Sequence, residues 1–67
     1  MKDVLLKGHV KLNNGEVKNF DNVIKSSIDT NGEVITFQYV FIEYPKNVKI
    51  ECEFDWDEIE EILFVVK

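Results

Sequence analysis

The sequence lacks alanine and arginine and has one cysteine, one histidine and one proline in 67 residues. A lone Cys52 excludes an internal disulfide, and with His9 as the single histidine the usual Cys/His zinc site is not available within one chain. The unpaired thiol is typical of a reducing compartment, so we expect a cytoplasmic protein. The absence of alanine and arginine beside abundant Lys, Asn and Ile suggests an AT-rich coding genome, as in phages and bacteria of low G+C content.

Long apolar runs are also missing. The first apolar cluster, residues 4–6, is followed at once by Lys7 and Gly8 and is too short for a signal peptide. No segment has the length of a membrane span, so we expect no membrane association. The length and the 45% hydrophobic fraction predict a single folded domain over residues 1–67. A chain of this size buries only about 60% of its unfolded surface, so self-association is an expected source of added stability.

Turn chemistry interrupts the chain at residues 13–15 (Asn-Asn-Gly), 30–32 (Thr-Asn-Gly) and 44–47 (Tyr-Pro-Lys-Asn). The runs between these turns read as strands, which predicts an antiparallel meander. Residues 4–12 alternate, with apolar side chains on one face and Gly8 among them, where we expect a bend, a bulge or a close approach. Residues 20–23 break the alternation, which predicts a bulge or bend in a long, curved second strand.

The run of residues 33–44 is apolar on both faces, and a strand of this kind must be covered on both sides. Since a domain this small covers only one side, we predict a protein interface that includes Tyr39, Val40, Phe41 and Ile42. Residues 48–56 alternate again and place Cys52 and Trp56 on the core side. For the tail we favour a helical turn at residues 57–60 and a short strand at residues 61–66. A C-terminal helix on a four-stranded sheet stays open as an alternative.

Residues 8–12 (Gly-His-Val-Lys-Leu), 14–16 (Asn-Gly-Glu), 20–23 (Phe-Asp-Asn-Val) and the closing segment 54–62 carry a resemblance to a small SH3-like or Sm-like barrel. The chain is also similar to uncharacterised short proteins of Gram-positive bacteria and their phages. The resemblance implies an all-β fold of about five antiparallel strands curled into a small barrel. It implies no activity, and the nucleic-acid-binding motifs of Sm proteins have no match here.

Charge is divided unevenly along the chain. Residues 1–25 carry five lysines and three carboxylates, whereas the rest carries three lysines and ten carboxylates. The acidic run of residues 51–61 is interpreted first as a solvated face. Two alternatives are a cation site at Asp55, Asp57, Glu58 and Glu61, whose spacing matches no EF-hand, and a surface that docks on a basic partner. The acidic residues predicted for such an interface are Glu53, Asp57, Glu58 and Glu61.

These patterns predict a binding protein and not an enzyme. Cys52 and His9 form no recognisable nucleophile–base pair, and no cofactor motif is present. The net charge of −5 and the lack of arginine disfavour nucleic acid as a partner. We therefore predict a self-associating protein-interaction module of phage or prophage type. Two alternatives stay open, namely an acidic inhibitor of a host nucleic-acid-binding or defence protein, and a small-ligand-binding oligomer.

Overall fold

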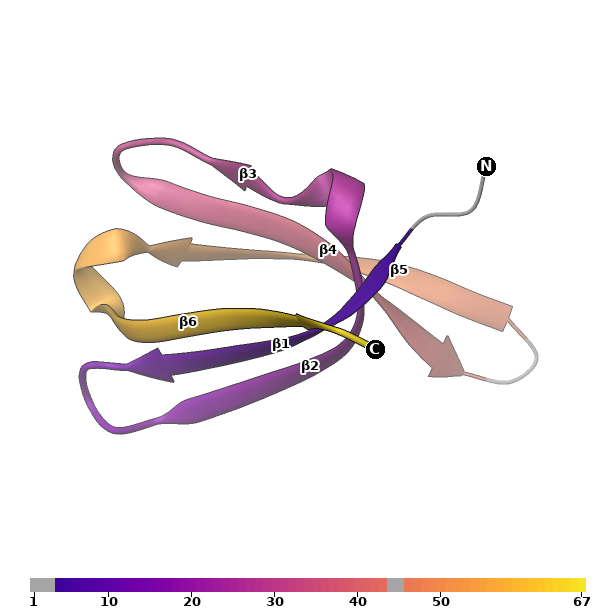
Figure 1. The fold of residues 1–67 in the computed structure, drawn as a ribbon, viewed down its shortest axis with the longest axis horizontal. Helices are drawn as coiled ribbons and strands as arrows, with labels where there is room; N and C mark the ends of the chain where they lie inside the picture. The colour runs from indigo at the N-terminus through magenta and orange to yellow at the C-terminus, as the bar shows by residue number, and fades with distance from the viewer. Residues whose placement is uncertain (1–3, 44–45) are drawn as a thin grey trace.

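The computed structural model describes residues 4–43 and 46–67, and every strand in it pairs antiparallel. The elements are β1 (Leu5–Leu12), β2 (Val17–Ile24), the 3-10 turn η1 (Lys25–Ser27), β3 (Asp29–Thr30), β4 (Val34–Glu43), β5 (Lys46–Asp55), the 3-10 turn η2 (Trp56–Glu58) and β6 (Ile59–Val66). They form a meander curled into a half-barrel (Figure 1). The all-β prediction is confirmed, and the alternative with a C-terminal helix is wrong because the tail is strand β6.

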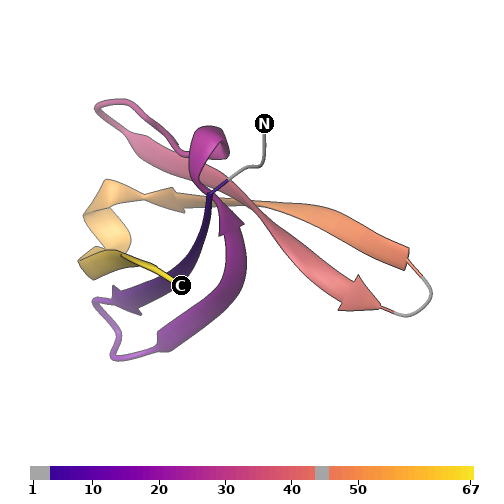
Figure 2. The same cartoon turned by 45° about the vertical axis from the view of Figure 1, so that its right-hand side comes forward.

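The strand order is β3-β4-β2-β1-β6, with β5 on the other edge of β4. Strand β1 pairs with β2 on one side and with β6 on the other, whereas β2 meets β4 only at Val23 and Tyr39 in the described register. Beyond that pair β4 and β5 leave the barrel as a two-stranded projection (Figure 2). We call residues 40–43 and 46–49 the arm; residues 44–45 of the predicted turn lie outside the described residues.

The core lies on the inner face of the curled sheet. Phe37 is completely buried and has the ring centroids of Phe20, Phe54 and Phe64 at 5.2, 6.2 and 5.4 Å. Strand β1 contributes its alternate residues Leu6, Val10 and Leu12, as its pattern predicts. The other buried hydrophobic residues are Val23, Ile24 and Ile35.

Gly8 lies where two aromatic residues flank β1. Its neighbours across the sheet are Phe20 on β2 and Phe64 on β6. A Cβ atom at Gly8 would lie 3.2 Å from Cε1 of Phe64 and 3.3 Å from Cγ2 of Val23. Next to Gly8 the β1–β2 register shifts, and Asn22 takes a left-handed φ of 59°. Both the bulge and the close approach that the sequence predicts are confirmed.

Gly8→Ala should lower the free energy of unfolding by about 1 kcal/mol, because the added methyl group crowds Phe64 and Val23 in a packed core. Gly32→Ala is the matched control, since a Cβ atom there meets nothing within 4 Å. Urea denaturation of both variants measures the difference. Equal stabilities of the two variants would show that the Phe64 ring packs equally well with a methyl group at position 8.

The predicted long second strand is wrong beyond Ile24, where η1 turns the chain. The Ser27 hydroxyl donates to the Ile24 carbonyl oxygen (2.6 Å) and accepts from the Gln38 amide (2.8 Å). This local pairing competes with strand geometry, a frequent property of serine. The chain resumes strand pairing only over the two residues of β3.

The predicted core position of Trp56 is also wrong. Trp56 begins η2, and its indole Nε1 donates to the Asn31 carbonyl oxygen at 2.7 Å, while its amide donates to the Glu33 carbonyl oxygen at 3.0 Å. Trp56 therefore fastens the end of β5 to the β3–β4 turn. Cys52 does pack against the core, as predicted, and is half-buried there. The helical turn begins one residue before the sequence indicates, at Trp56, and the last strand begins two residues before, at Ile59.

Candidate functional site

The predicted interface residues Tyr39, Val40, Phe41 and Ile42 follow one another from the barrel onto the arm. Tyr39 and Val40 are half-buried, whereas Phe41 and Ile42 are 51% and 68% exposed. Phe37, Tyr39 and Phe41 share a face of β4 and stand opposite Cys52, Ile50 and Val48 of β5. The apolar stripe of the core therefore continues onto the arm, where no third strand is paired with it in the described register.

A hollow of about 390 Å³ opens where β2 and β4 diverge, and it is lined by residues 19–22 and 39–42. The Phe20 ring lies at its floor against Tyr39, with the two centroids 5.1 Å apart. Backbone edges of both strands border this hollow, because their described pairing is confined to Val23 and Tyr39. An extended apolar segment fits such a place, since exposed strand edges pair readily with other chains.

The four acidic residues of the predicted interface come from three elements. Glu53 lies on the outward side of β5, Asp57 and Glu58 lie in η2, and Glu61 lies on β6; all four side chains are exposed. The backbone oxygens of Asp57 and Glu58 accept hydrogen bonds from Asn13, at 2.6 and 2.9 Å. Asn13 thus fixes η2 on the β1–β2 turn, and the side chains of Asp57 and Glu58 are left to solvent.

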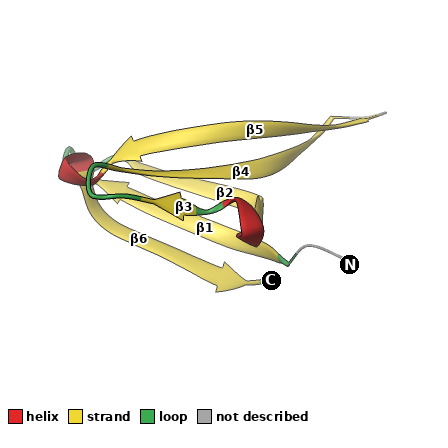
Figure 3. Cartoon of the chain, turned by 90° about the horizontal axis from the view of Figure 1, so that it is seen from above, coloured by secondary structure: helices red, strands yellow, loops and turns green. Residues whose placement is uncertain are grey.

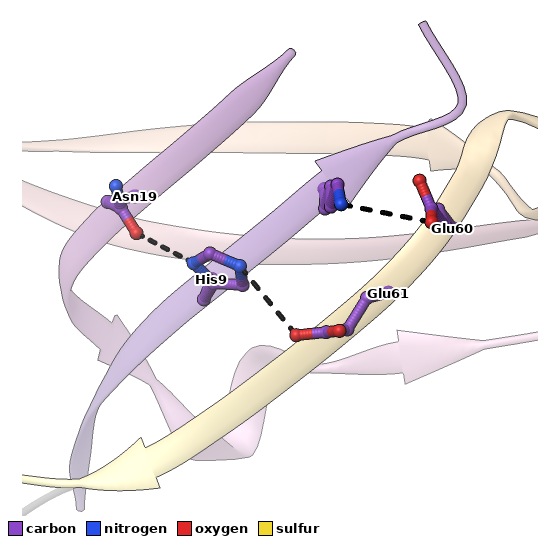
Figure 4. A network of polar contacts seen from close by, with 5 residues as sticks. His9, Asn19, Glu60 and Glu61 are labelled. Atoms are coloured by element: carbon purple, nitrogen blue, oxygen red, sulfur yellow. Dashed lines mark hydrogen bonds and ion pairs between the residues drawn. The ribbon is translucent and has the colours of Figure 1, made fainter. Parts of the chain in front are cut away.

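Part of the charge asymmetry is neutralised within the chain (Figure 4). On β1, Nε2 of His9 lies 3.8 Å from Oε1 of Glu61, and Nζ of Lys11 lies 3.8 Å from Oε1 of Glu60. The other ring nitrogen of His9, Nδ1, lies 3.0 Å from Oδ1 of Asn19. The exposed Lys11–Glu60 pair contributes about 0–1 kcal/mol, so it adds little to stability.

A second hollow, of about 430 Å³, lies on the outer face of the sheet and was not predicted from the sequence. Its apolar wall consists of Leu63 and Val65, which are 52% and 49% exposed. The remaining lining residues come from β1 and β2 and are Lys7, Gly8, His9, Asn19, Phe20 and Asp21. The uncharged run of residues 62–66 is the sequence signal for this surface.

The single cysteine and the single histidine lie on different faces of the sheet. Cys52 packs on the inner aromatic cluster, whereas His9 pairs across the outer face with Asn19 and Glu61. Burial raises the pKa of the Cys52 thiol, and the nearby charge of Lys18 partly lowers it. In the described part of the chain, no three His, Cys, Asp or Glu side chains are grouped in a way that would hold a metal ion.

Comparisons of the chain with protein-family models, with curated proteins and with solved structures gave no match. Over the described residues, the structure has no helix long and apolar enough to cross a membrane.

Proposed function

We propose that this domain is a non-enzymatic protein-interaction module that binds other protein through the arm, including copies of itself. The observation that carries the proposal is the continuation of the core's apolar stripe onto the arm at Phe41, which is 51% exposed, with Ile42, 68% exposed, on the opposite face of the arm. Burying either side chain contributes about 1.5–3 kcal/mol, so a partner that covers one face of the arm gains from association. The hollow between β2 and β4 adds strand edges that an extended partner segment can pair with.

We also propose a relation of this domain to known small barrels. The meander with a 3-10 turn before its last strand supports a relation to SH3-like or Sm-like barrels and to short proteins of Gram-positive bacteria and their phages. The free Cys52 thiol supports a reducing cytoplasm as the compartment.

One observation favours a second function, the acidic inhibitor of a basic host protein. Glu51, Glu53 and Asp55 share the outward side of β5, and the described residues offer them no ion-pair partner within the chain. A negative field of this kind attracts a cationic surface and speeds encounter with it. The two functions predict different salt dependence, because apolar association through the arm is not weakened by salt.

A double variant of the arm tests the main proposal. Phe41→Ser with Ile42→Ser should weaken self-association at least about tenfold, since both side chains leave an apolar contact. Val17→Ser is the matched control, because Val17 is an exposed apolar residue on β2 outside the arm. Sedimentation equilibrium at several protein concentrations gives the association constants, and circular dichroism checks that all variants fold alike.

Two results would overturn the proposal. One is a parent protein that sediments as a single chain up to millimolar concentration. The other is a folded double variant that associates as strongly as the parent.

A further inference from the structure

Two long edges of the half-barrel, those of β5 and β6, have no partner strand in the described part of the chain, and the two strands are joined through η2 (Figure 3). A two-fold pairing of β5 with β5 of a second copy, centred on Glu53, would set Glu51 against Asp55 and Glu53 against Glu53 of the second copy. Like charges directly opposite each other destabilise a strand pair, so the charges of β5 disfavour its pairing with a second copy. The second half of β6, residues 62–66, has no charged side chain.

The faces of β6 are fixed by its pairing with β1. Phe64 and Ile62 stand opposite Gly8 and Val10 on the inner face, whereas Leu63 and Val65 stand opposite His9 and Lys7 on the outer face. Leu63, Val65 and Val66 are all about half exposed or more. One edge of β6 thus has no partner strand, carries exposed apolar side chains and lacks charged ones over residues 62–66. Edges of this kind pair readily with the edge of another chain.

We infer that β6 pairs antiparallel with β6 of a second copy, about a two-fold axis at Phe64. This inference rests on the proposed self-association and names a surface for it besides the arm. In this register Leu63 stands opposite Val65 of the second copy on the outer face. Glu61 then stands opposite Lys67 of the second copy, so that an opposite-charge pair closes each end of the apolar contact. In the single chain Lys67 Nζ donates to Oδ1 of Asn22 at 2.6 Å and Glu61 lies 3.8 Å from His9, so dimerisation exchanges these exposed contacts for the pair between copies.

Charge complementarity selects this register over its neighbour. Outer-face residues of one β6 pair with outer-face residues of the other only when the two-fold axis passes through a residue. The register next to the one centred on Phe64 is therefore centred on Leu63. An axis at Leu63 would place Glu61 opposite Val65 and Lys67 opposite Ile59, and each charge would then lie against an apolar side chain. The axis at Phe64 avoids both mismatches.

A charge swap tests the inference on the whole chain. Glu61→Lys and Lys67→Glu should each weaken dimerisation about fivefold at low salt, because each places like charges opposite one another twice per dimer. The double swap should restore dimerisation to within about twofold of the parent. Glu51→Lys makes the same change of net charge on β5, and its effect should not be reversed by Lys67→Glu.

Cysteine pairs report the register directly. On a Cys52→Ser background, an equal mixture of Leu63→Cys and Val65→Cys proteins should oxidise mainly to the mixed disulfide dimer. Self-linked Leu63→Cys dimers in equal or greater yield would overturn the register, as would a double swap no better than the single variants. If the arm variant abolishes association while every β6 variant behaves as the parent, this inference fails and the proposed function stands. If the parent is monomeric, both fail.

Discussion

Phe37→Ala should leave the domain largely unfolded at room temperature. Phe37 has no exposed surface and contacts the rings of Phe20, Phe54 and Phe64. Truncating a buried phenylalanine costs about 3–5 kcal/mol, and native domains have a total stability of only about 5–15 kcal/mol, with small ones near the lower end. Circular dichroism and urea denaturation at low protein concentration measure the loss.

Phe41→Ala is the matched control for this prediction. Phe41 lies on the same face of β4, four residues further along the strand, but is 51% exposed on the arm. Its truncation should lower the free energy of unfolding by about 1 kcal/mol or less. A Phe37→Ala protein that unfolds as cooperatively and at the same urea concentration as Phe41→Ala would show that the core is not centred on Phe37.

Trp56→Ala should have the second largest effect on stability, a loss of about 2–3 kcal/mol. The variant removes both the half-buried indole and the hydrogen bond from Nε1 to the Asn31 carbonyl oxygen. Trp56→Phe keeps an aromatic ring and removes the hydrogen bond, so it should lose about 1 kcal/mol. Urea denaturation of both variants separates the two contributions. Equal losses in the two would mean that the ring itself contributes nothing to holding the β3–β4 turn.

The local features of this fold follow from the sequence because short-range chemistry decides them. The alternation of residues 4–12 predicts the buried side of β1, and the break at residues 20–23 predicts the bulge at Asn22. The Asn-Gly turn at Asn31 is built as its chemistry predicts, with Oδ1 accepting from the amides of Glu33 and Val34 at 2.7 and 2.9 Å.

The features that the sequence does not predict depend on contacts between distant segments. Whether Phe41 is buried depends on where β2 leaves β4, and that point is set by the single pair of Val23 with Tyr39. Trp56 leaves the core side because η2 rotates the chain out of strand geometry. The pairing of β6 with β1 brings Glu60 to Lys11, which forms an ion pair within the chain, and places Glu61 beside His9.

The same long-range pairing reveals the outer surface of β6. Sequence patterning assigns Leu63 and Val65 to a strand but does not say that the strand is an edge. Only the order β3-β4-β2-β1-β6 makes residues 62–66 an unpaired, uncharged edge. An edge strand of this composition is a binding surface or an aggregation hazard, and the proposed pairing of β6 with a second copy would cover it.

Sedimentation equilibrium of the unmodified protein, from micromolar to millimolar concentration, tests the central claim most directly. If the domain self-associates, its mass should rise with concentration from the 7.9 kDa of one chain towards at least twice that value. A constant mass of 7.9 kDa over the whole range, with the fold intact, would contradict the account.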